Sequence, residues 1–286
     1  MGKGGLPGHM ARAQRKAQQL GPLVDVILEV LDARAPLATG SPAAASLAAR
    51  RPAFTVMTHA DLAEPVTTGA WLRHYAARGR PAFAVDAITG EGIPKLRRGL
   101  SELHSGLAAG WQQRGLRERP LRAMVVGVPN VGKSSLLNRL ARRALARTGA
   151  KPGITRGEQW LRGGEGLELL DLPGMLPARA GDADARRMLT VIGVLTPAKE
   201  EALELAGWFL SEGRPALAAA IAGRAGAAYQ PGQTIEFIRE LGRRRGRLLP
   251  GGEVDLEATA LGFIRELASG QLGRCSLEAP PQEGGP

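Results

Sequence analysis

The amino-acid sequence predicts an α/β domain built on a mainly parallel sheet, followed by a small all-helical domain. Short apolar runs alternate with helix-like stretches in the first part of the chain, as expected when parallel strands are joined by crossover helices. A glycine-rich loop at 127–135 stands between one such run and an amphipathic stretch. From about Leu189 onward, apolar residues recur at helical spacing and no strand pattern is evident.

The expected strands are short apolar runs bounded by turn residues. They occupy 24–31, 53–57, 81–85 and 123–126. The first run ends at Asp-Ala-Arg-Ala-Pro (32–36), where proline stops the strand in a turn. Segments 158–161 and 167–170 flank Gly-Gly-Glu-Gly and predict a β-hairpin that leads to Asp171.

The expected helical domain rests on amphipathic patterns. Its first helix would align six apolar residues on one face, namely Ala202, Leu203, Leu205, Ala206, Phe209 and Leu210. Further amphipathic stretches lie at 235–241 and 256–267. The C-terminal residues are rich in Pro and Gly and predict a disordered tail. The expected segments are a basic N-terminal segment at 1–20, the α/β domain at 21–185, the helical domain at 189–277 and the tail at 278–286.

The chain is strongly basic. Lys and Arg total 38 against 27 Asp and Glu, which gives the 286 residues a formal net charge of +11. This excess favours a large polyanionic partner. Most of the basic residues are arginine, whose guanidinium group forks onto phosphates, so RNA fits best. The alternative is that the arginine content reflects genome composition and solubility.

Cysteine content and apolar runs bear on the compartment. The single cysteine, Cys275, excludes an intrachain disulfide and a multi-cysteine zinc site. No apolar run approaches the ~18 residues that a membrane helix needs, and the N-terminus lacks the apolar core of a secretory signal. We therefore expect a soluble, cytoplasmic protein with no membrane partner. A mitochondrial presequence is the alternative for the basic N-terminus.

Residues 127–134, Gly-Val-Pro-Asn-Val-Gly-Lys-Ser, form a complete phosphate-binding loop. The glycines allow the backbone to wrap a triphosphate, while the amides and dipole of the following helix attract its charge. Lys133 would reach the outer phosphates, and the Ser134 hydroxyl would hold Mg²⁺. The residues expected to bind the phosphates are Asn130, Val131, Gly132, Lys133, Ser134, Ser135 and Gly174.

Two later segments predict a nucleotide-dependent switch. Lys-Pro-Gly-Ile-Thr at 151–155 offers Thr155, whose hydroxyl would complete Mg²⁺ coordination until the terminal phosphate is lost. Asp171 follows the predicted hairpin, where its carboxylate would hold Mg²⁺ through water. The Gly174 amide would meet the terminal phosphate. The alternative is that Asp-Leu-Pro-Gly at 171–174 is only a turn.

Taken in order, these motifs resemble those of the circularly permuted ribosome-assembly GTPases of the RbgA (YlqF) family. The resemblance is carried by Pro-Gly-His-Met at 7–10, Asp-Ala-Arg-Ala-Pro at 32–36, the phosphate loop at 127–135, Pro-Gly-Ile-Thr at 152–155, Asp-Leu-Pro-Gly at 171–174, Gly-Gly-Glu-Val-Asp-Leu at 251–256 and Gly-Gln-Leu-Gly at 270–273. It spans nearly the whole chain. It implies a circularly permuted P-loop GTPase domain followed by a helical domain that binds rRNA.

The resemblance also implies a function. The chain would be a GTP-binding and GTP-hydrolysing factor for late assembly of the large ribosomal subunit. Hydrolysis would be stimulated by the ribosomal particle and coupled to release from it. The expected ligands are GTP or GDP with Mg²⁺, and K⁺ is a candidate second cation. The expected partners are the large ribosomal subunit precursor and its rRNA, which the protein would bind as a monomer.

The resemblance assigns the segment Thr58-His59-Ala60-Asp61 to guanine recognition, where the usual sequence is Asn-Lys-x-Asp. Asp61 would accept hydrogen bonds from the ring N–H and exocyclic amine of guanine. Its alternative role is to cap the next helix. Thr58 lacks the asparagine amide, and His59 replaces a long aliphatic stem. We therefore expect guanine selectivity to remain and guanosine affinity to be weaker than usual.

Further roles follow from the same resemblance. Asp86-Ala87 occupies the second guanine box, where the Ala87 amide would contact guanine O6. Met175 stands where many GTPases have a catalytic Gln, and the resemblance points instead to His9 as the residue that orients water. His9 would act with Lys133 and Thr155; the alternative is that it is a bystander. Asn130 resembles the asparagine of potassium-stimulated GTPases, with simple loop hydrogen bonding as its alternative.

A basic cluster lies in the expected helical domain. Arg243, Arg244, Arg245 and Arg247 are close enough in sequence to grip backbone phosphates. Aromatic residues are scarce, which favours recognition of folded RNA by shape over stacking on single strands. The alternative is that the cluster is a solvated helix end.

Two other functions are compatible with the motifs alone. One is an RNA-binding scaffold in which the altered guanine box leaves the nucleotide a structural role. The other is a phosphate-loop enzyme of different specificity, such as an ATPase. GTP turnover stimulated by large ribosomal subunits would exclude the scaffold, and a clear preference for GTP over ATP would exclude the ATPase.

Overall fold

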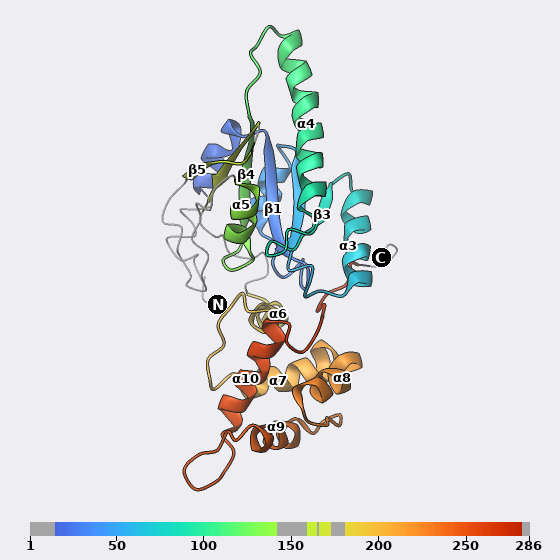
Figure 1. Ribbon diagram of the computed structural model, residues 1–286, viewed down its shortest axis with the longest axis vertical. Helices are drawn as coiled ribbons and strands as arrows, with labels where there is room; N and C mark the ends of the chain where they lie inside the picture. Colours follow the sequence, from blue (N-terminus) through green and yellow to red (C-terminus); the bar gives the residue numbers. More distant parts are fainter. Residues whose placement is uncertain (1–14, 142–158, 165, 173–180, 282–286) are drawn as a thin grey trace. The chain divides into compact units, whose positions relative to one another are not determined.

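The computed structural model describes residues 15–141, 159–164, 166–172 and 181–281 (Figure 1). These residues divide into two compact units, the first within 1–179 together with 279–286, and the second within 180–278. The first unit is an α/β fold and the second is helical. Their boundary falls before helix α6 (Ala183–Val191), whose first turn the sequence had assigned to the first domain.

The first unit is built on a six-stranded sheet in the order β3-β2-β1-β4-β6-β5. The strands are β1 (Val26–Asp32), β2 (Ala53–Thr58), β3 (Ala82–Ala84), β4 (Leu121–Gly127), β5 (Gln159–Arg162) and β6 (Leu167–Asp171). Neighbouring strands are parallel except for β5, which forms an antiparallel pair with β6. Strand β4 comes fourth in the chain but lies between β1 and β6. The predicted α/β class and permuted order are thus confirmed.

Helices join the parallel strands. The 3-10 turn η1 (Gly21–Leu23) precedes β1, and the α-helices that follow strands are α2 (Pro42–Ala48), α3 (Pro65–Ala77), α4 (Ile93–Gln113) and α5 (Lys133–Leu140). Against β1 and β2, the buried Trp71 of α3 packs with Leu31 and Met57. Helix α4 is much the longest of these and projects past the end of the sheet (Figure 1). Residues 114–120 connect the end of α4 to the start of β4.

The carboxyl ends of four parallel strands meet at one edge of the sheet. β1 ends at Asp32, directly opposite Thr58 at the end of β2. β4 ends at Gly127, and β6 ends at Asp171, which pairs in register with Val125 of β4. Ligands of open parallel sheets bind at this edge, where the loops after the strands converge. The fold therefore brings the phosphate loop and the predicted guanine segments to the same edge.

The second unit is a helical bundle. Its elements are α6, α7 (Ala202–Trp208), a π-helical turn η2 (Phe209–Gly213), α8 (Pro215–Ala225), α9 (Thr234–Arg244) and α10 (Leu256–Ala268). Phe209 and Phe237 both pack edge-on against Phe263 in the core. The described strand content is a single isolated bridge between Leu248 and Val254. Every helix within the described ranges is too short or too polar to cross a lipid bilayer.

Candidate nucleotide-binding site

The phosphate loop follows β4 directly and needs glycine at both ends. A Cβ at Gly127 would lie 2.6 Å from the carbonyl oxygen of Val30, so a side chain there would force the loop away from β1. Gly132 has φ 88° and precedes the first residue of α5. This left-handed conformation is easily adopted by glycine and turns the chain so that the N-terminus of α5 faces the loop. Asn130 also has a positive φ, 58°.

Lys133 is folded into the phosphate loop. Its Nζ donates hydrogen bonds to the carbonyl oxygens of Gly127 at 3.1 Å and Val128 at 2.7 Å. Only 9 % of the residue is exposed. Burial lowers the pKa of Lys133 to about 8, against the opposing effect of the Asp171 carboxylate. A positive charge is thus held at a solvation cost, which phosphate oxygens would offset.

The two described residues predicted to hold Mg²⁺ lie on neighbouring elements. Asp171 is buried at the end of β6, and Ser134 is half-buried in the first turn of α5. A carboxylate and a hydroxyl are oxygen donors of the kind that Mg²⁺ prefers. Three other predicted site residues, His9, Thr155 and Gly174, lie outside the described residues.

Thr58 joins the guanine segment to the phosphate loop. Its side chain is buried at the end of β2, and its Oγ1 lies 2.6 Å from the carbonyl oxygen of Val131 and 2.9 Å from that of Leu31. A hydroxyl carries one proton and can donate to only one of these carbonyls at a time. Thr58 therefore has a positioning role towards the loop, and its hydroxyl is occupied by protein backbone.

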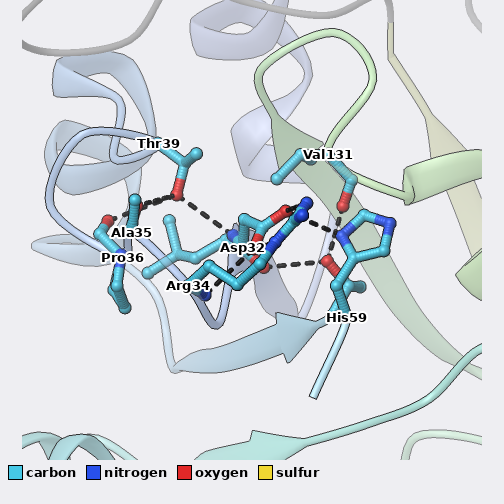
Figure 2. A network of polar contacts seen from close by, with 9 residues as sticks. Asp32, Arg34, Ala35, Pro36, Thr39, His59 and Val131 are labelled. Carbon is cyan, nitrogen blue, oxygen red and sulfur yellow. Dashed lines mark hydrogen bonds and ion pairs between the residues drawn. The ribbon is translucent and has the colours of Figure 1, made fainter. Parts of the chain in front are cut away.

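His59 lies in a polar network with Asp32 and Arg34 (Figure 2). The Asp32 carboxylate accepts hydrogen bonds from the backbone amide and Nε of Arg34, both at 2.9 Å, and from its Nη2 at 2.8 Å. Nδ1 of His59 lies 2.8 Å from Oδ2 of Asp32. Burial raises the pKa of Asp32, but Arg34 and His59 outweigh that effect and hold the pKa well below its usual range.

The remaining residues of this segment lie in a turn beside β3. The amide of Ala60 donates to the carbonyl of Val85, and Asp61 is half-buried. Helix α3 begins at Pro65 with Glu64 at its N-cap position. Asp61 thus lies three residues before the N-cap position, in the turn between β2 and α3.

Asp86 closes the loop that forms the second guanine box. Its carboxylate accepts hydrogen bonds from the Ile88 amide at 2.7 Å and the Thr89 hydroxyl at 2.5 Å. Burial raises the pKa of Asp86, and these hydrogen bonds more than compensate and lower it. The side chain thereby serves the turn itself and fixes the backbone around Ala87.

Sequence reasoning missed Arg139, which joins this loop to the phosphate-loop helix. From the last turn of α5, its Nε donates to the carbonyl of Ala87 at 3.1 Å, and its Nη2 contacts the carbonyl of Ile88. It also missed the Asp32–Arg34 pair as part of the site. The signals in the sequence were the position of Asp32, directly after the first apolar run, and the Asp-Ala-Arg-Ala-Pro motif that the resemblance includes.

In the helical unit, the predicted arginine cluster lies at the end of α9 and just after it. Arg244 donates to Glu240 at 2.6 Å, and Arg245 forms a bidentate pair with Glu266 of α10. Arg247 donates to the carbonyl of Ala258 at 3.2 Å. Arg243 is exposed, and its side chain makes no hydrogen bond or ion pair with another described residue. The four arginines are therefore not equivalent.

Comparisons with known proteins agree with this site. The family model described as 50S ribosome-binding GTPase matches residues 122–238. The chain is 32% identical to ribosome biogenesis GTPase A of Bacillus cereus over 97% of this chain and 94% of that protein. It is 30% identical to the protein of the same name from Thermotoga maritima over 96% and 93%.

Solved structures of YlqF from Thermotoga maritima are also similar, at 27% sequence identity. The GDP-bound structure gives a TM-score of 0.61 over 93% of this chain and 99% of that chain. The GNP-bound structure gives a TM-score of 0.60 over 94% and 98%.

Proposed function

Because this chain belongs to the ribosome biogenesis GTPase A family, we propose that it is a GTP-dependent factor for late assembly of the large ribosomal subunit. The chain is a GTP-hydrolysing enzyme that binds guanine nucleotide. The observation that carries the proposal is the convergence of three features on one sheet edge: the phosphate loop with the buried Lys133, Asp171 at the end of β6, and the guanine segment that Thr58 ties to the loop.

In the proposed nucleotide complex, Lys133 turns its ammonium group from backbone carbonyls to the outer phosphates. The amides at the start of α5 donate to the same phosphates. Ser134 and Asp171, with Thr155, would hold Mg²⁺, which neutralises phosphate charge when bound. Asp61 accepts from the guanine ring, and the amide of Ala87 donates to guanine O6.

Hydrolysis needs an oriented water, and His9 is the proposed residue that orients it. We propose that the ribosomal particle brings the N-terminal segment into place, so that hydrolysis is stimulated on the particle and is followed by release. We also propose K⁺ as a second cation beside the phosphates, with Asn130 of the phosphate loop as its candidate ligand. A monomeric protein acting in the cytoplasm is part of the same proposal.

GTP turnover measured with and without immature large ribosomal subunits tests this proposal. We expect the subunits to raise the rate by at least about tenfold, as partner surfaces do for other GTPases whose catalytic groups are completed in trans.

The helical unit is the proposed rRNA contact, and Arg243 is its clearest candidate. Its guanidinium is exposed, while Arg245 is engaged with Glu266 and holds α9 to α10. Replacing Arg243 by Gln is expected to lower the slope of log affinity for the subunit against log salt by about 1, because one phosphate contact releases about one counterion.

The control for this prediction is Arg98→Gln, which removes the same charge from an exposed position on α4 of the first unit. It should leave the slope unchanged. Co-sedimentation with large subunits over a series of KCl concentrations gives both slopes. If Arg243→Gln keeps the wild-type slope, Arg243 does not contact phosphate.

A further inference from the structure

The end of β1 holds a carboxylate that the proposed nucleotide contacts do not use. The side chain of Asp32 is 0 % exposed, and that of its partner Arg34 is 5 % exposed. The Asp32 amide donates to the Thr39 hydroxyl at 3.0 Å, and Thr39 in turn donates to the carbonyl of Ala35 at 2.8 Å. The Thr39 hydroxyl thus forms hydrogen bonds with both ends of the turn that begins at Asp32. A buried carboxylate is costly unless it is paired, so its retention at this edge of the sheet calls for an explanation.

Arg34 fills only part of the hydrogen-bonding capacity of the Asp32 carboxylate. It occupies Oδ1 with two donors and Oδ2 with one, and the remaining contact of Oδ2 is with Nδ1 of His59. Figure 2 shows the carboxylate between the guanidinium and the imidazole. Arg34 fixes Asp32, and Asp32 fixes one edge of the His59 ring. A carboxylate in contact with Nδ1 is a common way to set the orientation of an imidazole.

The backbone of His59 supports the same orientation. His59 has φ 53°, an uncommon conformation for a residue with a side chain. Its carbonyl accepts a hydrogen bond from the amide of Leu62 at 3.0 Å, which closes the turn. The ring lies against the phosphate loop, since a Cβ at Gly132 would be 3.4 Å from its Cε1. About a third of the side chain, 30 %, stays accessible to a ligand.

We propose that Asp32, anchored by Arg34, is a positioning residue for guanine binding: it holds the His59 imidazole beside the phosphate loop as a flat platform for the base. The proposal rests on the proposed nucleotide site. A lysine stem at this position would have to be ordered when the base binds, whereas the paired imidazole is already in place. The Asp32–His59 pair thus compensates for the missing lysine of the usual guanine box.

A double-mutant cycle tests the pairing. The variants are Asp32→Asn, His59→Ala and the double variant, and the readout is GDP affinity in the presence of Mg²⁺, from displacement of a fluorescent GDP analogue. We expect His59→Ala to weaken GDP binding about tenfold, within the range for base–aromatic stacking. Asp32→Asn should weaken it by about fivefold in the wild-type background and by less than about twofold in the His59→Ala background.

Two controls separate positioning from stability. Glu29→Gln neutralises another buried carboxylate of β1, which is paired with Arg80 and is not at the site, and it should leave GDP affinity unchanged. The second control uses inorganic tripolyphosphate with Mg²⁺ to displace the fluorescent GDP analogue. Tripolyphosphate carries no base, so it should not contact the His59 imidazole. Its affinity should be the same in wild type, Asp32→Asn and His59→Ala.

The outcomes distinguish this inference from the proposed function. If Asp32→Asn weakens GDP binding equally with and without His59, or weakens tripolyphosphate to the same extent, Asp32 does not act through the imidazole. An equal loss in Glu29→Gln would also overturn the inference. If the wild-type protein binds neither GDP nor GTP, the nucleotide site itself is wrong.

Discussion

Replacing Lys133 by Ala is expected to weaken binding of GTP and GDP by at least about 30-fold, because truncating one partner of a buried charge pair costs ~2–5 kcal/mol. The ammonium group donates hydrogen bonds to two carbonyl oxygens of the phosphate loop. Burial has already lowered its pKa to about 8. Wild-type affinity should therefore also decline as pH rises above 8, because binding then requires uptake of a proton. Titration calorimetry with Mg²⁺ present measures both effects.

The control for this prediction is the melting temperature of Lys133→Ala measured without nucleotide. Since a charged lysine with a lowered pKa is held against a solvation cost, removing it should not lower the melting temperature of the empty protein. Wild type, by contrast, should gain thermal stability from added GDP, and the variant should not. If the variant without nucleotide melts at a much lower temperature than wild type, Lys133 supports the fold. Its loss of nucleotide affinity would then say little about phosphate binding.

Replacing Arg34 by Ala is expected to lower the free energy of unfolding by about 3–5 kcal/mol at neutral pH, because it leaves the buried Asp32 carboxylate without its main partner. The folded state holds the pKa of Asp32 below its ordinary value of 3.8. The stability from this pair is therefore fully present above pH 3.8 and is lost as pH falls below it. The deficit of Arg34→Ala should accordingly narrow in acid.

Urea unfolding at pH 7 and at about pH 3, below the ordinary pKa of the carboxyl, measures this deficit. The control is Arg122→Ala, which breaks a cross-strand pair with Glu168 whose side chains are 39 % and 32 % exposed. Exposed pairs contribute only ~0–1 kcal/mol, so this variant should stay close to wild type at both pH values. If both variants lose the same stability, or if the Arg34→Ala deficit is independent of pH, the buried pair does not stabilise the fold as described.

Much of the fold could be predicted because its signals are local. Each parallel strand is a short apolar run, and β1, β2 and β4 lie within one or two residues of their expected bounds. The phosphate loop combines two glycines, a lysine and a following helix in eight residues. The alanine-rich helix α8 was not predicted, since alanine gives little amphipathic contrast between its faces.

The polar contacts of the site could not be predicted because they join distant segments. Asp32 meets His59 only because β1 and β2 are paired in register, and Arg139 reaches Ala87 across the fold from α5. The arginine cluster shows the same limit in the helical unit. Four neighbouring basic residues predict one surface, yet Arg244 and Arg245 are engaged with Glu240 and Glu266. Only the fold decides which of these charges remain free of ion pairs within the protein.

The rate of GTP hydrolysis on immature large ribosomal subunits tests the central claim most directly. Phosphate release would be measured for the wild-type protein alone, for the wild-type protein with subunits, and for Lys133→Ala with subunits. Each measurement would be made with GTP and with ATP. The account predicts slow turnover alone, a rise of at least about tenfold with subunits and GTP, and no comparable rise with ATP or with the variant. A rate that stays unchanged on subunits to which the protein visibly binds, or an equal rise with ATP, would contradict it.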